Sequence, residues 1–439
     1  MIRLFDWLSP EALDLSFSLD RSGFSATTVV LNDDGCLPER VTSPYSFFCQ
    51  MEEGEINPLY FNQVPVPDFW EITANNVQGE IWNRGQKMGN IFYHEPKHKR
   101  LVKHVDWLDR TGKVFSTDHY NQYGWVFAKT FFDFEQKPVI KKYYDRQGQE
   151  VLLENVKVGS HLLNWNGKHY HFENKRVFVD FYLKNSQLDL SQIWYHSLGM
   201  PFMLSYYLEK DGTDILFFQE KLGEDIPGNM KVILEGRTRR TKRVIFQDKT
   251  SYEKALELLP QEQVEKIDYL GYLYPEERLN SNQKEILILT NSDQLHELTA
   301  LVEGLKNYNF HIGALTEMSQ RLMAYEQYDN VTLYPNISAS MVEELFESCD
   351  IYLDINHGGE ILNAVRRSFE QNLLVLAFDN ICHNPTYTIQ EHRFEQDKVN
   401  ELMSYLQELT DFEPAVQKQR TLSGQEKPER YRLVLEREA

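Results

Sequence analysis

The sequence lacks several features that would assign it to a familiar class of protein. Its four cysteines, Cys36, Cys49, Cys349 and Cys382, form no C-x-x-C pair and are too few for a disulfide framework, so we expect a reduced, cytosolic setting. No apolar run reaches the ~18 residues of a membrane span. The first residues also lack the basic segment and apolar run of a secretion signal. We therefore expect any contact with a membrane to be peripheral.

Positive charge is scarce as well. The chain has 46 Lys and Arg residues against 66 Asp and Glu residues, which gives a net charge of −20. A field of this sign repels nucleic acid and anionic lipid, so we predict no nucleic-acid partner. The local exception is "EGRTRRTKR", which carries Arg237, Arg239, Arg240, Lys242 and Arg243. Two alternatives remain for this basic run: a solvated turn, or a contact with lipid headgroups or another subunit.

Short apolar runs alternate with helix-period segments from about residue 285 onward. The runs are "EILILT" (285–290), "FHIGAL" (310–315), "VTLYP" (331–335), "IYLDI" (351–355) and "LLVLAF" (373–378). Such runs are typical of strands that are buried on both faces and joined by crossover helices. They predict a parallel, doubly wound sheet. A last helix is expected near residues 398–410.

Residues 61–183 show a different pattern, in which apolar and polar residues alternate. The alternating runs include "GKVFSTDHY", "WVFAKTFFDF", "VIKKYYD" and "HYHFENKRVFVDFYL". The segments "DRTG", "DRQG" and "WNGK" separate such runs, and Asn-Gly and Asp-x-x-Gly turns are typical of hairpins. The pattern predicts an antiparallel β-meander.

An α/β pattern lies on either side of this meander, beginning with "IRLFDW" before it and including "KVILEG", taken as a strand, after it. We predict an N-terminal Rossmann-like domain (1–60 and 184–272), an inserted β-meander domain (61–183), a C-terminal Rossmann-like domain (273–420) and a polar tail (421–439) that has no core to bury. The predicted fold class is α/β. It has the GT-B arrangement of two doubly wound domains, which nucleotide-sugar glycosyltransferases share with other enzymes.

The stretch "DINHGGEILNAVRRSFEQNLLVLAF" predicts a strand end, a glycine turn, a helix and a second strand. A GT-B enzyme holds the donor diphosphate at such a helix N-terminus. The two glutamates of retaining enzymes fall here on Gly359 and Arg367, and a guanidinium group cannot accept hydrogen bonds from ribose hydroxyls. The loop "LTNSDQLHEL" also lacks a cation to bind a diphosphate. The residues therefore argue against a working donor site.

Ordinary structural roles are open to the remaining polar residues of this stretch. Arg366, Arg367 and Glu370 suit surface pairs on a helix, and Glu360 suits a carboxylate at a helix N-terminus. Elsewhere, His94 and His98 have the spacing of a zinc pair, but Pro96 disfavours the helix that would align their rings. The sequence contains no P-loop and no G-x-G-x-x-G motif, so we predict no metal and no cofactor.

Several segments resemble a known family over nearly the whole chain. They are "MSQRLMAYEQYDNVTLYPNIS", "LDINHGGEILNAVRRSFEQNLLVLAFDN" and the meander with its "YYDRQGQE" turn. The family is that of the stabilising, non-catalytic subunits of the peptide O-GlcNAc transferase of serine-rich repeat adhesins, found in the accessory Sec system of streptococci and staphylococci. The resemblance implies a GT-B pseudo-enzyme that is paired with a catalytic GT-B paralogue, with two copies of each subunit.

The same resemblance implies that the chain holds the unfolded adhesin polypeptide at the cytoplasmic face of the cell membrane. On that basis we predict an acceptor-binding cleft at the second sheet. Its predicted residues are Asn336, Asn356, His357, Gly358, Gly359 and Glu360. Two other hypotheses stay open. One is an active retaining glycosyltransferase that uses UDP-GlcNAc with Glu360 or Glu370 in a rearranged site, and the other is a lectin-like module for glycosylated peptide.

Overall fold

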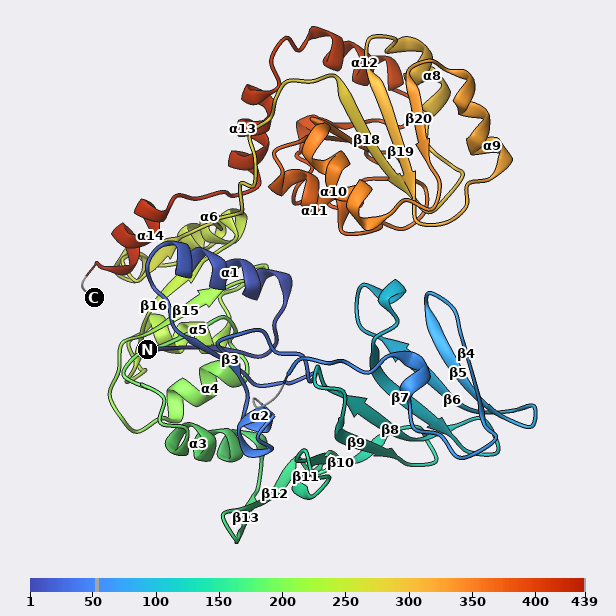
Figure 1. Cartoon of the computed structure of the whole chain (residues 1–439). Coiled ribbons are helices and arrows are strands. Elements are labelled where there is room, and N and C mark those ends of the chain that lie inside the picture. The colour runs from blue at the N-terminus through green and yellow to red at the C-terminus, as the bar shows by residue number, and fades with distance from the viewer. Residues whose placement is uncertain (52–54, 438–439) are drawn as a thin grey trace. The chain divides into compact units, whose positions relative to one another are not determined.

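The structure is a computed structural model that describes residues 1–51 and 55–437. It contains two compact units. The first comprises residues 1–270 together with the segment that begins at Arg432, and the second comprises residues 271–431. Figure 1 shows the elements of each unit. The predicted fold class, two Rossmann-like sheets with an inserted antiparallel meander, is confirmed.

A parallel sheet forms the centre of the first unit (Figure 1). Its strands, in spatial order, are β17 (Ile267–Tyr269), β16 (Thr241–Phe246), β15 (Asp214–Phe218), β14 (Ile193–Tyr195), β1 (Ile2–Phe5), β2 (Thr27–Val30) and β3 (Val41–Thr42). Chain order therefore reverses between β1 and β14, which is the switch point where doubly wound sheets bind ligands. Strands such as β15 are buried along their whole length, as a sheet covered on both faces requires.

Helices connect these strands. They are α1 (Pro10–Arg21), α2 (Pro44–Phe48), α3 (Lys175–Asn185), α4 (Met200–Tyr207), α5 (Gly228–Leu234), α6 (Lys249–Leu258) and α7 (Gln261–Val264). Helix α1 begins at Pro10, because Ser9 caps it by accepting a hydrogen bond from the Ala12 amide and Pro10 occupies its first turn. The segment "KVILEG" was predicted as a strand and belongs instead to α5, whose buried Met230, Ile233 and Leu234 follow helical spacing.

The inserted meander is an antiparallel sheet whose strands follow chain order. They are β4 (Glu71–Ala74), β5 (Gln78–Asn83), β6 (Gln86–Tyr93), β7 (Val102–Leu108), β8 (Val114–Tyr120), β9 (Val126–Phe132), β10 (Pro138–Tyr144), β11 (Glu150–Asn155), β12 (Ser160–Trp165) and β13 (Lys168–Phe172), with the 3₁₀ turns η1 (Phe61–Gln63) and η2 (Lys97–Lys99) beside them. Several hairpins share one device: the first carboxylate oxygen of Asp109, Asp133 or Asp145 accepts two backbone amides of its own turn. The meander was expected to reach residue 183, but residues 175–183 lie in α3, because Asn174 caps the Val177 amide and starts a helix.

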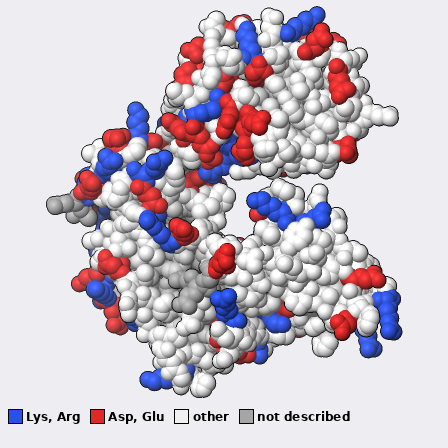
Figure 2. Space-filling view, viewed as in Figure 1, with Lys and Arg blue, Asp and Glu red and all other residues white. Residues whose placement is uncertain are grey.

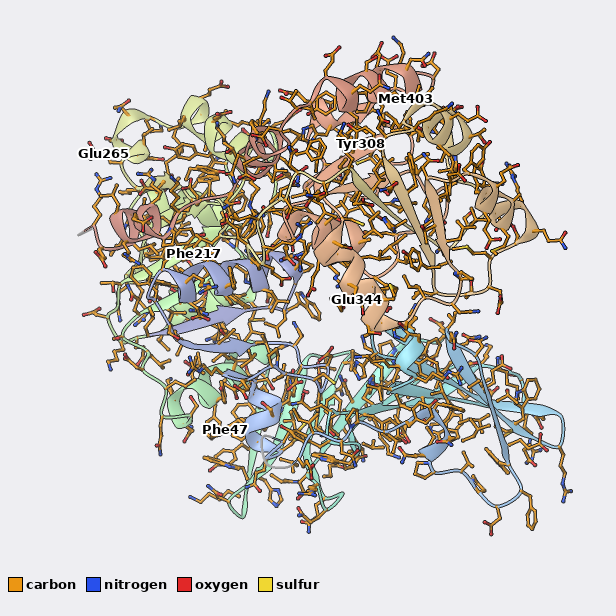
Figure 3. All side chains as sticks on the ribbon, turned by 45° about the horizontal axis from the view of Figure 1, so that its top comes forward. Phe47, Phe217, Glu265, Tyr308, Glu344 and Met403 are labelled. Carbon is orange, nitrogen blue, oxygen red and sulfur yellow. The ribbon has the colours of Figure 1, made fainter. Side chains whose placement is uncertain are left out.

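The meander packs against the first sheet through aromatic side chains. The ring of Tyr45, on α2, stacks on Tyr143, on β10, with centroids 4.5 Å apart. Figure 3 shows Phe47, which lies on the same helix α2 as Tyr45. Gly35 approaches β9 so closely that a Cβ atom would lie 2.6 Å from the Phe127 ring, and its φ of +88° suits glycine.

The second unit is built on another parallel sheet. Its strands, in spatial order, are β20 (Val331–Tyr334), β19 (Asn309–Ala314), β18 (Glu285–Thr290), β21 (Ile351–Asp354), β22 (Leu374–Phe378) and β23 (Arg393–Phe394). The first five confirm the predicted apolar strands, and chain order reverses between β18 and β21 as it does between β1 and β14. The two sheets thus share one topology.

The helical elements of the second unit cover both faces of its sheet. They are α8 (Leu298–Gly304), α9 (Gln320–Met323), η3 (Ala324–Gln327), α10 (Ala339–Ser348), α11 (Ala364–Glu370), η4 (Gln390–His392), α12 (Val399–Glu408) and α13 (Glu413–Leu422). Helix α12 confirms the helix predicted near residues 398–410, but it is not the last one, because α13 follows it before the expected tail. Tyr308 and Met403 show how it packs (Figure 3): the Tyr308 hydroxyl donates to the Leu406 carbonyl over 2.6 Å, and Gly304 leaves room for Met403.

An arginine and an aspartate lock the amino-terminal edge of each sheet. Asp214, at the start of β15, pairs with Arg240 at 2.8 Å, and both side chains are fully buried. Asp350, just before β21, pairs with Arg278 at 2.7 Å. Because burial leaves each carboxylate dependent on its arginine, these pairs fix the strands of the scaffold.

The C-terminal segment differs from the predicted polar tail. Residues Pro428–Leu435 form helix α14, and they bury Tyr431 and Val434. The Tyr431 hydroxyl donates to the Gly271 carbonyl over 2.6 Å, and Arg243 donates to the Val434 carbonyl over 2.8 Å. The expectation failed because two well-spaced apolar residues suffice to anchor a helix that is otherwise charged. Within the described residues, no helix has both the length and the apolar character needed to cross a bilayer.

Candidate functional site

The candidate site lies at the carboxyl-terminal edge of the second sheet, at its switch point. Strand β18 ends at Thr290 and is followed by Asn291, and the neighbouring strand β21 ends at Asp354 and is followed by Asn356. Ligands of doubly wound sheets bind beside such strand ends. A donor nucleotide would therefore meet the side chains of these loops.

Asn356 holds the loop together. Its side-chain carbonyl lies 2.9 Å from Thr290 Oγ1 and accepts the Gly358 amide at 2.9 Å. Its amide group donates to Asn291 Oδ1 at 3.1 Å and to the Gly359 carbonyl at 3.2 Å. Because Asn356 is 3% exposed and uses both its amide oxygen and its amide nitrogen, it has little capacity left for a ligand.

His383 closes the same loop from the segment that follows β22. Its Nδ1 lies 2.6 Å from Asp354 Oδ1, its backbone amide donates to Asp354 Oδ2, and its Nε2 lies 2.7 Å from the Gly358 carbonyl. The hydrogen bond to the buried Asp354 carboxylate raises the pKa of His383 to about 9, so the ring is an imidazolium that donates from both nitrogens at neutral pH. The sequence analysis missed His383, because only the fold brings it back to β21.

The two glycines have unequal roles. A Cβ atom on Gly358 would lie 1.9 Å from Asn291 Oδ1, whereas one on Gly359 would meet nothing closer than Asn291 Nδ2 at 4.0 Å. Asn291 therefore fills the space above Gly358 from the β18 side. In the sequence this loop was notable for its lack of a cation, and in the structure its asparagine completes the closure.

The predicted glycine turn into a helix N-terminus is absent. Leu362 and Asn363 adopt positive φ values of 55° and 53°, and α11 begins only at Ala364, after this irregular segment. The expectation followed the helical spacing of "EILNAVRRSF", but the backbone of Leu362 and Asn363 interrupts that helix. The phosphate-binding geometry that a glycine turn would provide is therefore missing here.

The acidic candidates have structural partners. Glu360 Oε1 accepts the Val365 amide at 2.9 Å, and burial raises the pKa of its carboxyl group. Glu370 pairs with Arg366 at 2.9 Å, and Arg367 pairs with Glu343 at 2.6 Å. These contacts agree with the ordinary helix-capping and surface-pair roles weighed from the sequence.

The other predicted cleft residues are not all brought together. His357 is exposed, and its Nε2 lies 3.3 Å from His296 Nδ1 near the closed loop. Asn336 follows β20, which is separated from β18 by β19, and it donates to Glu317 Oε1 over 2.6 Å. The structure therefore gathers residues 356–360 in one loop and leaves Asn336 apart. Throughout the described chain, no three or more His, Cys, Asp or Glu side chains are placed to hold a metal ion.

The basic run is partly buried. Arg240 forms the ion pair with Asp214, and Arg243 pairs with Asp268 at 2.8 Å, so these two arginines are unavailable to lipid or to another subunit. The prediction of a partner or membrane contact is wrong for them because both arginines are buried and each is paired with an aspartate. Arg237, Arg239 and Lys242 are exposed, and for them the contact stays a prediction.

A second set of polar groups lies at the carboxyl-terminal edge of the first sheet, and the sequence analysis missed it. Asp6 follows β1, and its Oδ2 accepts a hydrogen bond of 2.6 Å from Ser197, which follows β14. Lys175, the first residue of α3, donates to Asn32 Oδ1 over 2.6 Å. The residues come from segments far apart in sequence, so the only signal available was that Asp6 directly follows an apolar strand.

Comparison with known proteins agrees with this architecture. Four family models match the chain: the GtfB N-terminal domain (residues 2–48), the GtfB middle domain (70–173), the GtfB third domain (175–258) and the GftB/GlyA-F C-terminal domain (286–425). The chain is 53% identical over 416 residues to the UDP-N-acetylglucosamine--peptide N-acetylglucosaminyltransferase stabilizing protein GtfB of Streptococcus parasanguinis, and the match covers 95% of this chain and 94% of that protein.

Solved structures give the same result. A chain in the crystal structure of a GtfA/B complex bound to UDP and GlcNAc superposes with a TM-score of 0.94 at 40% identity, over 99% of both chains. The pneumococcal O-GlcNAc transferase GtfA, solved with UDP and GlcNAc, matches over 99% of this chain and 98% of its own with a TM-score of 0.53 and 14% identity, which shows a shared fold. The chain belongs to the GtfB family of peptide N-acetylglucosaminyltransferase stabilizing proteins.

Proposed function

We propose that the chain is the non-catalytic stabilising and acceptor-binding subunit of a protein O-GlcNAc transferase complex. The complex would glycosylate Ser and Thr of serine-rich repeat adhesins before their accessory-Sec export. The observation that carries this proposal is the closed edge of the second sheet, where Gly359 and Arg367 replace donor-site acids and the loop bonds to itself through Asn356 and His383. A site in which the polar groups satisfy one another has little left for a donor sugar.

The catalytic partner in this proposal is a GT-B paralogue. Support comes from the relative that is named as a stabilizing protein and from the similar chain in a complex of GtfA and GtfB. A paralogue that keeps a donor site would carry out the sugar transfer, so this chain would not need a donor site of its own. We propose a hetero-oligomer with two copies of each subunit.

Turnover and binding of UDP-GlcNAc test this function. We expect no hydrolysis or transfer by the isolated full-length chain, and transfer to a serine-rich peptide once the partner is added. Calorimetric titration of the isolated chain with UDP-GlcNAc should give no heat of binding. Turnover by the chain alone would favour instead a glycosyltransferase with a rearranged site, and Glu360→Gln would then abolish that turnover.

We propose that the partner binds one end of the meander. The connections after β7, β9 and β11 lie at the same end of the sheet, because successive antiparallel connections alternate between its two ends. Three apolar side chains project there with large exposed fractions: Phe115 at 51%, Phe134 at 94% and Val158 at 71%. Lys157 and Asp133 join two of the turns at 2.7 Å. Clustered apolar groups of this kind mark a surface that binds another molecule.

Introducing negative charge at the turn tips tests this surface. Phe134→Asp combined with Val158→Asp should prevent co-purification of the partner and leave thermal unfolding of the isolated chain unchanged, because both side chains are exposed. A matched control is Phe69→Asp, since Phe69 is 95% exposed and precedes the edge strand β4, which β5 and β6 separate from the nearest of these turns. Full retention of the partner by the double variant would move the interface elsewhere.

Acceptor binding suits weak, repeated contacts. Serine-rich segments are disordered, so each bound segment loses conformational entropy and binds modestly. Many such segments on one polypeptide raise the effective concentration of the next one. A non-catalytic subunit that holds the acceptor in this way would supply the catalytic partner with substrate.

We also propose a peripheral location at the cytoplasmic face of the cell membrane, as the family resemblance implies. The exposed cations of the basic run, Arg237, Arg239 and Lys242, are the groups available for anionic lipid there. Flotation of the complex with vesicles of phosphatidylglycerol and phosphatidylcholine tests this. We expect the double variant Arg237→Glu/Lys242→Glu to weaken flotation. If the complex floats equally well with vesicles of pure phosphatidylcholine, the basic run does not bind anionic lipid.

A further inference from the structure

The edge of the first sheet differs from the closed edge of the second because some of its polar atoms have no partner. Among the described residues, no donor contacts Asp6 Oδ1, although Ser197 binds the other oxygen of the same carboxylate. Lys175 makes one hydrogen bond, to Asn32, out of the three that an ammonium group can donate. Both side chains are half-buried. The edge therefore retains hydrogen-bonding capacity in a partly dry environment.

The meander adds two charged residues to this edge. Lys141 on β10 and Glu154 on β11 are directly opposite each other in the antiparallel register. Cross-strand neighbours of opposite charge usually pair, but these do not approach within ion-pair distance. The Lys141 ammonium instead lies 5.0 Å from the centre of the Tyr143 ring, and the Tyr143 hydroxyl donates to Glu154 over 3.3 Å. In the described residues, Lys141 has no hydrogen-bond partner.

Contacts and electrostatics bring the two sets together. Helix α2 packs against β11, and α3 packs against β12 and β13, beside the first sheet (Figure 1). Burial lowers the pKa of Lys175, the carboxylates of Glu154 and Asp6 oppose that shift, and Lys141 adds to it. Contacts join the same groups. Asn32 Nδ2 donates to the Asp6 carbonyl over 2.9 Å, and Asn32 Oδ1 accepts from Lys175. The Lys175 ammonium also lies 5.7 Å from the centre of the Tyr45 ring, which stacks on Tyr143 of the meander. We name this set, which consists of Asp6, Trp7, Lys141, Glu154, Lys175 and Ser197, the first-edge site.

The charges of the first-edge site indicate the kind of ligand. Two ammonium groups and two carboxylates balance within the site, and the nearby carboxylate of Asp33 is buried and already accepts hydrogen bonds from Ser43 and the Gly35 amide. Neither a phosphate nor a cation would therefore meet a field of a single opposite sign. Donors and acceptors occur side by side, which suits a neutral chain that carries both, such as peptide amides and serine hydroxyls. Trp7, directly after Asp6, is 61% exposed and offers the flat aromatic surface typical of binding hot spots.

Room for a longer ligand lies close by. Asp33, which accepts a hydrogen bond from Ser43 at the N-terminus of α2, lines a cavity of about 510 Å³ whose walls include residues of the first sheet and of the meander. Other polar and aromatic residues of its wall include Thr42, Ser46, Phe47, Gln122 and Tyr123. Its walls come from the Rossmann-like part and from the meander, as do the residues of the first-edge site.

We propose that the first-edge site binds the unmodified serine-rich acceptor segment. This inference rests on the proposed acceptor-binding function and moves the acceptor from the cleft predicted at the second sheet to the first sheet. Peptide amides and serine hydroxyls replace water on Asp6 Oδ1, Lys141, Glu154 and Lys175, and Trp7 packs on the bound chain. The closed edge of the second sheet takes no part in binding.

Fluorescence anisotropy with a fluorescein-labelled synthetic peptide of serine and alanine tests the proposal, using the full chain in complex with its catalytic partner. We expect Trp7→Ala to weaken binding about ten-fold, as loss of a central aromatic contact does. Asp6→Asn and Lys141→Met should each weaken it about three- to ten-fold, because each removes one charge-assisted hydrogen bond. Trp7→Phe should restore most of the affinity lost in Trp7→Ala.

Three controls make the outcome decisive. Phe69→Ala removes an exposed aromatic ring remote from the first-edge site and should bind like the wild type. His357→Ala alters the second sheet and should also bind normally, and a large loss there would overturn the proposal. Unfolding midpoints and co-purification of the partner identify variants that fail to fold. If the wild-type complex binds no peptide, the proposed function fails. If it binds and the first-edge variants bind equally well, only the location fails.

Discussion

The two parallel sheets have the same strand order, apart from the additional edge strand β17 of the first sheet. Their carboxyl-terminal edges differ in whether the polar groups there have hydrogen-bond partners. Both sheets reverse chain order between their first and fourth strands, and both have at their amino-terminal edge an Arg–Asp pair whose carboxylate is fully buried. At the second sheet, Asn356 and His383 tie the loop to neighbouring backbone and side chains. At the first sheet, Asp6 and Lys175 keep hydrogen-bonding capacity. The strand order sets where a ligand could bind. Whether a ligand can bind there depends on whether the polar groups of the edge are already hydrogen-bonded to one another.

The difference also has a thermodynamic side. A half-buried charge without a partner destabilises the fold, whereas a paired one at a closed edge contributes to stability. Proteins retain such costs mainly where function requires them. The polar groups at the carboxyl-terminal edge of the second sheet therefore suit a role in stabilising the fold. Those at the edge of the first sheet suit a binding surface.

If the buried pair fixes the amino-terminal edge of the first sheet, loss of Arg240 should have the largest effect on stability. We expect Arg240→Ala to lower the free energy of unfolding by about 3–5 kcal/mol, because Asp214 would stay buried and unpaired. Chemical denaturation measures this. The neighbouring Arg239→Ala serves as the control and should change stability by less than about 0.5 kcal/mol, since its side chain is 56% exposed. Equal effects of the two variants would contradict the buried-pair account.

Opening the second edge should have the next largest effect. His383→Ala removes both ring hydrogen bonds and leaves Asp354, which is 1% exposed, without its cation. We expect a loss of about 2–3 kcal/mol in unfolding free energy. His357→Ala, in the same loop but exposed, should cost less than about 0.5 kcal/mol. A neutral His383→Ala would show that the edge is not closed by this residue.

The same residue predicts a pH dependence. The pKa of His383 is raised from its ordinary 6.5 to about 9 in the folded chain, so the stability it contributes is fully present below pH 6.5 and is lost as the pH rises through about 9. The stability difference between the wild type and His383→Ala should therefore shrink between these values. Denaturation curves of both proteins across that range measure the difference. A difference that stays constant with pH would contradict a protonated His383.

Much of this comparison follows from the sequence, and its limits have physical causes. The apolar runs predicted the second sheet because strands buried on both faces need continuous apolar residues. A donor site without its acids was predicted from Gly359 and Arg367, which lie within one short segment, and its loss stays a prediction. The closure by His383 and the grouping of Asp6 with Lys175 through Asn32 were not predicted, because each joins residues that only the tertiary fold brings together. The helix expected at Glu360 failed because the backbone of Leu362 and Asn363 departs from helical values.

The adjacent glycines Gly358 and Gly359 test how tightly the second edge is packed. We expect Gly358→Ala to destabilise the chain by about 1–3 kcal/mol, because its Cβ would overlap Asn291 Oδ1. Gly359→Ala is the matched control and should be neutral or slightly stabilising, since the nearest atom lies 4.0 Å away. Thermal or chemical unfolding measures both. The double variant Asn291→Ala/Gly358→Ala should recover part of the loss if the two side chains compete for the same space.

The smallest expected effect separates the two edges most directly. Lys141→Met removes a half-buried ammonium that has no hydrogen-bond partner among the described residues and whose pKa burial lowers, so stability should stay the same or rise by up to about 1 kcal/mol. Lys142→Met, on the next residue, removes a 2.8 Å pair with Glu150 on the other face of β10 and should cost no more than about 1 kcal/mol. Denaturant midpoints and peptide affinity are measured together. Unchanged stability with weaker peptide binding is expected for Lys141→Met, whereas a destabilised variant would make Lys141 structural and the two edges alike.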